Sequence, residues 1–474
     1  MRHLILLASF LFSAVGFRGQ DITWTEHIAP MIYENCSHCH REVSVAPFPL
    51  LSYDDVDDHA LSMYFAMEER HMPPWPADPD YRHFLGETVL TDQQIADFLT
   101  WIESGKPYGD PDLEPLPPIF NDQGSVLGSV DYTFEIEPYT LQYNTDETRW
   151  FVIDPGFEQT VYINKIEVIP DPQAAAHHID ISLDLTSTSM NYDSQDPLPG
   201  FNSSTGAPNY SYYMNAWQPG AGPAIYPENW GIEVPPGAHF VMEVHYGPGF
   251  AETIDHTKIN FEFVENVEEV RPVHASWMLG TFNMTNGPLY IPANTSAQFY
   301  QQTASLSSPL SLIAICPHMH LIGREYEVWF ETWDGIEVPL ISIPQWDFHW
   351  QFYYYFEQIQ MVPAGAKIHG RGLYDNSEDN PYNPNNPPID VWNGPNTTDE
   401  MFLCYFIHAN YEEGDENLSV EWVNVGVDEP SNRPIPEWDL HPNPANTDTF
   451  ITGFVGSEDL TVEITSISGE CQFY

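Results

Sequence analysis

Basic residues are scarce in this chain. Its 474 residues include 14 lysines and arginines against 69 aspartates and glutamates, which gives a formal net charge of −55. Such a chain repels polyanions, so neither nucleic acid nor an anionic membrane surface is expected as a partner. The acidic residues are spread along the sequence, and no EF-hand spacing accompanies them. We interpret the acidity as an adaptation to solubility or to a saline environment.

Long apolar runs are also missing. Beyond the first residues no apolar stretch of about 20 residues occurs, so no membrane span is predicted. Residues 1–16 combine Arg2 with an apolar run from Leu4 to Val15 and end in small residues, a pattern typical of a secretory signal. We therefore expect an exported protein, and the length predicts two to four domains.

Cysteine is rare too, with five in the whole chain, which excludes a dense disulfide framework. Two of the five stand in one motif, Cys36-Ser37-His38-Cys39-His40. This C-x-x-C-H pattern is the attachment signature of a c-type haem. Its two thiols can form thioether bonds to the porphyrin, and His40 can then ligate the iron. The motif predicts an electron carrier that matures outside the cytoplasm, which agrees with the signal.

Two other interpretations of the motif are weaker. Half a zinc site would need two more ligands nearby, but the next cysteine is Cys316, and a thioredoxin-like pair would need a βαβ setting that the sequence lacks. For the sixth iron ligand we favour Met72, because the two prolines after it stiffen the loop and Met/His ligation suits electron transfer. Three further side chains remain alternatives: Met63, Met67 and His71.

The sequence divides into a helical and a β-rich part. Residues 21–106 predict a small all-α unit, similar to a cytochrome c domain, with a helix over residues 54–69. A second helix begins at a capping box formed by Thr91 and Gln94, and we expect its apolar stripe to comprise Ile95, Phe98, Leu99 and Ile102. Residues 107–124, rich in proline and acidic residues, predict a linker.

From residue 125 short alternating runs recur between Pro, Gly and Asn turns, which is typical of antiparallel sandwiches or jelly rolls. The pattern continues to about residue 428, and a break near residues 269–273 divides it into two all-β units, 125–268 and 269–428. Residues 376–388 predict an ordered loop. Residues 429–437 predict a second linker, before a short β tail at residues 438–474.

The β-rich part contains three histidine motifs: His177-His178, His245 and His318-Met319-His320. On a strand, His318 and His320 share one face and can bind one ion, while Met319 points away. Adjacent histidines alternate faces, so His177 and His178 can bind one ion together only at a bulge or a strand end. Each motif alone is a weak signal, and an incidental histidine pair is the competing interpretation. The other histidines, including His349, are interpreted as hydrogen-bonded or surface residues.

The order of the motifs is more specific. His177-His178, His245-Tyr246-Gly247, His318-x-His320 and Asp399-Glu400-Met401 follow one another as in the copper type II, ascorbate-dependent monooxygenases, which the chain resembles over about residues 125–425. Peptidylglycine α-hydroxylating and dopamine β-monooxygenase belong to that family. The resemblance implies two jelly-roll domains with one copper ion each. Its implied ligands are His177, His178 and His245 for the first ion and His318, His320 and Met401 for the second.

Imidazole and thioether ligands suit copper that alternates between Cu(I) and Cu(II). Family members hydroxylate a C–H bond of an organic substrate with O2 and two electrons, normally from ascorbate. The resemblance therefore implies a monooxygenase with two coppers, and ascorbate or another external reductant as electron source. Our hypothesis is that the fused haem, fed by a redox partner, relays electrons to the first copper. A nearby tyrosine of the family is retained as Tyr405.

The chain departs from the family at the substrate end. Peptide-processing members carry an arginine where this chain has Cys316, and an asparagine where it has Leu403. Loss of the arginine argues against a peptide carboxylate as the substrate, which leaves another small-molecule or peptide-like organic compound. Because Cys316 shares a face with His318 whereas Cys404 points the other way, we expect two buried thiols rather than a disulfide.

The tail begins with His441-Pro442-Asn443-Pro444-Ala445 and ends near Gly469, and it resembles the C-terminal sorting domain of the type IX secretion system. This resemblance implies a location at the cell surface or outside the cell. A simple terminal β-hairpin is the alternative. For the whole chain, the rivals to a monooxygenase are a non-catalytic electron-transfer or copper-binding protein, and a surface protein that binds a carbohydrate or another partner.

Overall fold

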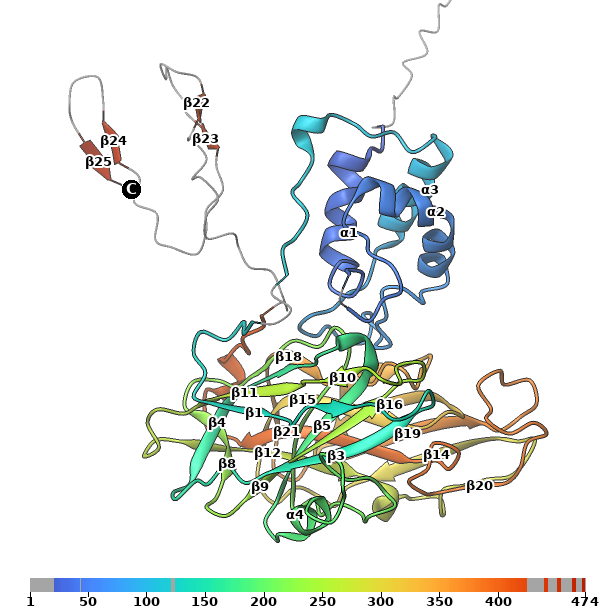
Figure 1. Cartoon of the computed structure of the whole chain (residues 1–474), viewed down its shortest axis with the longest axis vertical. Helices are drawn as coiled ribbons and strands as arrows, with labels where there is room; N and C mark the ends of the chain where they lie inside the picture. Colours follow the sequence, from blue (N-terminus) through green and yellow to red (C-terminus); the bar gives the residue numbers. More distant parts are fainter. Residues whose placement is uncertain are drawn as a thin grey trace, which may run out of the picture.

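The computed structural model describes residues 21–42, 44–120 and 124–423, together with four short strands in the tail. A helical part precedes a larger β-rich body (Figure 1, blue above cyan to orange). The described chain is therefore mostly β, as the sequence predicts. The signal predicted at residues 1–16 and the linker predicted at residues 429–437 lie outside the described residues. No helix within the described ranges is long and apolar enough to cross a membrane.

The helical part contains α1 (Ala29–Asn35), α2 (Tyr53–Glu68) and α3 (Asp92–Glu103), after a π-helical turn at Trp24–Ile28. The predicted capping box at α3 is confirmed, because Thr91 accepts the N–H of Gln94 and the Gln94 side chain accepts the N–H of Thr91. The apolar stripe differs from the prediction. Phe98 and Trp101 are fully buried against Trp24, whereas Ile95, Leu99 and Ile102 are only partly buried.

One segment of the helical part belongs to the β body. The side chains of Ala77 and Phe84 are buried in the core of that body. The backbone N–H of Asp78 donates to the carbonyl of Ser342 at 2.8 Å, and that of Leu85 donates to the carbonyl of Tyr355 at 2.9 Å. Residues 77–85 therefore attach the helical part to the β body.

In the described chain the β body contains two large sheet systems and two short two-stranded sheets. Thirteen strands form one connected network, and four others form a second sheet in the order β14-β19-β16-β17. The strands of the first half are β1 (Tyr132–Glu135), β2 (Tyr139–Thr140), β3 (Glu147–Ile153), β4 (Val161–Ile169), β5 (Ala176–Asp184), β6 (Tyr212–Trp217), β7 (Ala224–Ile225), β8 (Trp230–Val234), β9 (His239–Tyr246), β10 (Ile254–Asp255) and β11 (Lys258–Phe263). A short helix, α4 (Thr188–Asp193), lies between β5 and β6.

The second half is built from a further set of strands. They are β12 (Arg271–Leu279), β13 (Tyr290–Ile291), β14 (Ser296–Gln302), β15 (Leu310–Met319), β16 (Gly323–Glu331), β17 (Glu337–Ile343), β18 (Tyr354–Val362), β19 (Lys367–Asp375), β20 (Val391–Trp392) and β21 (Phe402–Asn410). Two buried clusters follow the division. One is centred on the strands of residues 134–261 and the other on those of residues 279–406.

Strand β12 begins within the break that the sequence indicates and joins the two halves. Its residues 271–273 pair in parallel with β8, and its residues 274–279 pair antiparallel with β21. At the crossover the Arg271 guanidinium lies 4.1 Å from the ring centroid of Trp230 and forms an ion pair with the buried carboxylate of Asp415. The halves are thus two cores that share a sheet.

Two further predictions concern loops and the tail. The loop at residues 376–388 is ordered by side-chain hydrogen bonds, since the buried amide of Asn376 donates to the carbonyls of Ile291 and Ile389 at 3.0 and 2.7 Å.

In the tail, β22 (Asp439–His441) pairs with β23 (Phe450–Thr452), and β24 (Glu463–Thr465) pairs with β25 (Cys471–Phe473). The rest of residues 438–474 lies outside the described part of the chain.

Candidate functional site

The first histidine cluster comprises His177, His178 and His245, on the neighbouring strands β5 and β9. The register of these strands shifts between Ala176 and His178, so His177 is the extra residue of a bulge and His178 stands opposite His245. The Nδ1 atoms of His177 and His178 are 3.2 Å apart, and each residue of the cluster offers a nitrogen within 4.8 Å of the others. The adjacent pair thus converges at a bulge, one of the two local geometries that the sequence required.

Burial keeps this cluster neutral. It lowers the pKa of His177 to about 4, with further lowering by His245 and His349. The pKa of His178 lies well below its ordinary value and that of His245 is also lowered, again mainly through burial. Neutral imidazoles present lone pairs, which is the state that binds a metal ion. Three such groups converging in one place are a nitrogen donor set of the kind that binds copper or zinc.

The second cluster comprises His318, His320 and Met401. The imidazoles of His318 and His320, at the end of β15, lie with ring centroids 5.2 Å apart and planes at 90°. The Nδ1 of His318 hydrogen-bonds the side-chain oxygen of Gln351, and the Nδ1 of His320 hydrogen-bonds the carbonyl of Asp399 at 3.0 Å. These bonds leave each Nε2 as the ligand atom, which is how protein partners usually orient metal-binding histidines. Met319 is fully buried in the core, away from the cluster, as predicted.

Glu400 connects two of the segments that form the second cluster. Its side chain is fully buried and accepts the backbone N–H groups of His320 and Ile322 at 2.8 Å each and of Met401 at 3.2 Å. Burial raises the pKa of this carboxyl to about 8 against the opposing effect of those donors. The carboxyl therefore fixes the turn after β15 to the segment that carries Met401. The sequence placed Glu400 in a motif but gave no signal of this role.

All six residues line one cavity of about 450 Å³, here called the central cavity. Met401 lies on its wall together with both histidine pairs, and His318 is near enough to His178 to lower the pKa of His178. Tyr405 lines the cavity as well and packs on Tyr213 at a centroid distance of 5.0 Å. No lysine or arginine is among the described residues of its lining.

The two cysteines near the cavity are free thiols, as predicted. Cys316 is on the cavity wall, whereas Cys404 is buried in the second core. Burial raises the pKa of both thiols, so they are protonated at neutral pH.

Several side chains of the central cavity were not predicted, among them three that can titrate or bind a metal ion: His349, Asp180 and Glu243. His349 lies with its ring centroid 5.9 Å from that of His177 and hydrogen-bonds Asp347 at 2.8 Å. Asp180 and Glu243 stand opposite each other on β5 and β9 and offer oxygens near His178. Burial raises the pKa of Asp180 to about 7, and the neighbouring Glu243 adds to the shift. The sequence predicts His349 only as a hydrogen-bonded or surface residue, and it carries no signal that this side chain lies beside His177.

The C-x-x-C-H motif forms one turn after α1. The carbonyl of Cys36 accepts the N–H of Cys39 at 3.2 Å and that of His40 at 2.9 Å. The Nδ1 of His40 hydrogen-bonds the carbonyl of Phe48 at 3.0 Å, which leaves its Nε2 for an iron ion. Both cysteines are free thiols. This donor set fits a c-type haem.

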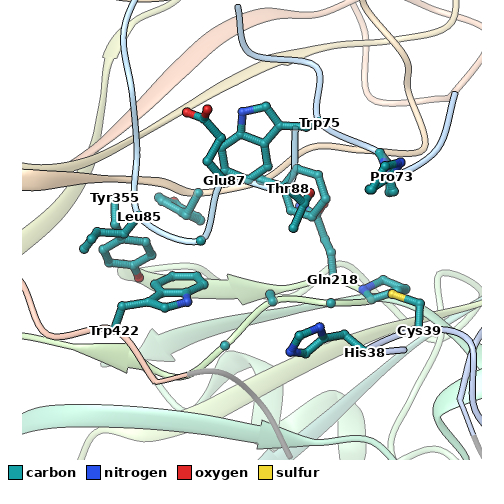
Figure 2. A pocket seen from close by; sticks show the side chains of 18 of the residues that line it. His38, Cys39, Pro73, Trp75, Leu85, Glu87, Thr88, Gln218, Tyr355 and Trp422 are labelled. Atoms are coloured by element: carbon teal, nitrogen blue, oxygen red, sulfur yellow. The ribbon is translucent and has the colours of Figure 1, made fainter. Parts of the chain in front are cut away.

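A pocket of about 310 Å³, here called the motif pocket, lies between this turn and the β body. Figure 2 shows His38 and Cys39 in it together with Gln218 and Trp422 of the β body. Pro73 lines the pocket, while the side chain of Met72, the predicted sixth ligand, is 39% exposed. Of the alternatives, Met63 and Met67 are buried in the helical core.

Comparisons with known proteins name no relative. No protein-family model matches the sequence, and no curated protein matches it. Among solved structures, the PBSX exported protein XepA matches 56% of this chain and 96% of its own at 8% identity, with a TM-score of 0.15. The infectious bursal disease virus VP2 subviral particle matches 64% and 87% at 10% identity, with a TM-score of 0.14. Procruciferin, the 11S globulin from Brassica napus, matches 60% and 85% at 8% identity, with a TM-score of 0.12. Scores this low support no conclusion.

Proposed function

We propose that this protein is a copper-dependent monooxygenase that hydroxylates a C–H bond of an organic substrate with O2, and that a c-type haem on the same chain supplies its electrons. One observation carries the proposal: the six side chains expected from the motif order, distributed over 225 positions of sequence from His177 to Met401, line a single cavity. Convergence of this kind is expected of a site and not of incidental histidines.

The donor set favours copper. His177, His178 and His245 would hold one ion, and His318, His320 and Met401 the other. When bound, copper supplies one-electron redox chemistry and activation of O2, for which imidazole and thioether ligands are suited. A hydrolytic zinc site would instead favour a carboxylate or a third imidazole in place of the thioether. We also propose that the two β halves are jelly-roll domains and that the helical part is a cytochrome c domain.

The surrounding residues prepare the ligands. Gln351 and the carbonyl of Asp399 fix the rings of His318 and His320, and Glu400 holds the backbone of His320 and Met401. Ligands held in this way need no rearrangement when an ion binds, which strengthens binding. Tyr405 and Cys316 complete the wall beside the second cluster.

The cavity wall also bears on the substrate. Among its described residues it contains three carboxylic acids, Asp146, Asp180 and Glu243, and neither lysine nor arginine. A substrate carboxylate would find no cation to pair with there. The proposed substrate is therefore a neutral or positively charged organic molecule, in agreement with the absence of the family's arginine at Cys316. Export to the cell surface remains part of the proposal on the strength of the sequence alone.

The test is O2 consumption by purified protein with haem attached and copper loaded. A panel of neutral and amine compounds is offered with a reductant, and incorporation of ¹⁸O from ¹⁸O2 is followed by mass spectrometry. We expect labelled product from at least one compound, with loss of product in His318→Ala. The matched control is His274→Ala, since His274 is an exposed histidine of β12 that does not line the cavity.

The rival functions predict different results. Copper binding without labelled product from any compound would support a non-catalytic electron-transfer or copper-binding protein. Protein that binds no copper would support a surface binding protein. Either result would overturn the proposal.

A further inference from the structure

Three aromatic side chains form a row that runs from the central cavity to the surface: Tyr213 of β6, Tyr405 of β21 and Trp277 of β12, here called the aromatic row. The rings of Tyr213 and Tyr405 lie with centroids 5.0 Å apart, and those of Tyr405 and Trp277 lie 6.2 Å apart with planes at 30°. Both tyrosines line the cavity. Trp277 does not, and it is 54% exposed. One ring contact therefore separates the cavity from an exposed indole.

The strand register places this contact beside the second cluster. Tyr405 stands opposite Trp277 on one side and opposite Cys316 on the other. Cys316 is two positions before His318, so the two side chains share a face of β15, and both line the cavity. A single exposed tryptophan needs no explanation. What distinguishes Trp277 is its contact with a tyrosine that itself faces the cavity.

The same cavity wall contains side chains that oxidation would damage. Met401 and Cys316 both line it. An oxidant that meets no substrate there would convert the thioether to a sulfoxide or the thiol to a sulfenic acid. Tyrosine and tryptophan rings also lose single electrons readily, and electron transfer between rings in contact is fast because electronic coupling falls steeply with distance.

The environments of the two rings give the row a direction. Oxidation of a phenol or an indole is coupled to loss of its proton. Burial raises the pKa of Tyr405, with further raising by Asp180 and Cys316, so the phenol holds its proton inside the protein. The exposed indole of Trp277 releases its proton to solvent instead. An oxidising equivalent is therefore more stable on Trp277 than on Tyr405.

We infer that the aromatic row carries oxidising equivalents from the central cavity to Trp277, and so protects the predicted copper ligands when no substrate is bound. This inference rests on the proposed function. In the balanced step, hydrogen peroxide takes one electron from reduced copper and one from Trp277 by way of Tyr405. With the indole proton and one proton from solvent it becomes two molecules of water, which leaves Cu(II) and a neutral Trp277 radical. A reducing small molecule in solution then returns an electron, and solvent a proton, to the radical.

The experiment treats the copper-loaded protein with hydrogen peroxide and limiting ascorbate, without substrate, and maps oxidised residues by peptide mass spectrometry. Trp392 is the internal control, because it is 56% exposed and stacks on Tyr290 at a centroid distance of 4.1 Å, yet neither residue lines the cavity. We expect oxidation of Trp277 well before that of Trp392. Without copper the two indoles should react equally slowly.

Two variants interrupt the row, and copper content is measured in each. Tyr405→Phe retains a ring but removes the oxidisable phenol, so oxidation of Trp277 should fall to the level of Trp392 and Met401 sulfoxide should appear. Trp277→Phe should also produce Met401 sulfoxide, with faster inactivation from an unchanged initial rate. Rapid-freeze electron paramagnetic resonance should show a tryptophan radical in the wild type and a tyrosine radical in Trp277→Phe. The matched control, Tyr290→Phe, should oxidise Trp277 as the wild type does.

The outcomes separate this inference from the proposed function. Copper-loaded protein in which Trp277 and Trp392 are oxidised equally, or in which Trp277→Phe leaves Met401 no more oxidised than in the wild type, would overturn the aromatic row while leaving a copper monooxygenase intact. Protein that binds no copper would overturn the proposed function and this inference with it.

Discussion

Replacing Glu400 by glutamine should damage the second cluster while leaving the first intact. The carboxyl is fully buried and accepts three backbone N–H groups through its two oxygens, two through one oxygen and one through the other. A glutamine amide has one oxygen only. In its better orientation it keeps the N–H groups of His320 and Met401 and turns its own NH2 group toward the N–H of Ile322.

The loss of folding free energy in Glu400→Gln follows from this change in hydrogen bonding. One buried backbone donor without an acceptor costs about 1–3 kcal/mol, and two donors facing each other place the result toward the upper end of that range. This is a substantial share of a total stability of about 5–15 kcal/mol. Burial raises the pKa of this carboxyl from 4.5 to about 8, so the folded wild type binds its proton more tightly than the unfolded chain and loses stability as the pH rises between those values. Glutamine does not titrate, so the difference between the two proteins should be greatest at low pH and should shrink as the pH approaches about 8.

The assay combines urea unfolding with copper titration. We expect Glu400→Gln to lower the free energy of unfolding by about 3 kcal/mol and to weaken copper binding at the second cluster by about 10–100-fold, with the first cluster unchanged. The control is Glu416→Gln, since Glu416 is exposed and bonds only local groups, so a change within about 0.5 kcal/mol is expected. If Glu400→Gln behaves like this control in both measurements, the reasoning about the buried carboxyl is wrong.

Three further predictions concern stability. Arg149→Met should cost about 3–5 kcal/mol in urea unfolding, because it leaves the buried carboxylate of Asp196 without its partner at 2.9 Å; a loss below about 1 kcal/mol would contradict a structural role for that pair. Burial lowers the pKa of His408 to about 4, so the folded state binds fewer protons than the unfolded state below about pH 6.5, and stability should fall between about pH 6.5 and pH 4 by roughly 3 kcal/mol through this group. His408→Gln should flatten that part of the pH profile, and an unchanged slope would refute the assignment. Removing copper with a chelator should lower the melting temperature, because a ligand of the native state at about 100 times its Kd contributes about 2.7 kcal/mol; the double variant His177→Ala with His318→Ala should show no such copper dependence, and a full copper-dependent shift in that variant would place the metal elsewhere.

The parts of the fold that sequence could predict are those set by local signals. The helix after Thr91 follows from its capping box. For His177 and His178 the sequence required a bulge or a strand end if both imidazoles were to face one ion, and the structure has the bulge. The opposite directions of Cys316 and Cys404 follow from the two-residue period of a strand. These features depend on neighbouring residues, so their physical cause is visible in a short stretch of sequence.

The features that sequence missed depend on distant partners. Glu400 is 80 positions from the backbone of His320 that it binds, and Gln218 is 133 positions from Gln351, whose backbone N–H its side chain accepts. Burial of Ala77 in the β body, and the sharing of β12 between both halves, likewise arise from tertiary packing. Propensity and periodicity report on burial but not on which distant group satisfies a buried polar atom, so these contacts became visible only with the fold.

The central claim, that three distant histidine motifs and Met401 form a pair of copper sites around one cavity, is tested most directly by copper X-ray absorption of the fully reduced protein. The account predicts two copper ions per chain and a sulfur scatterer at one of them. The sulfur signal disappears in Met401→Ala, while the imidazole signal of the first cluster remains. A copper content below two, or a sulfur signal that survives removal of the Met401 thioether, would contradict it.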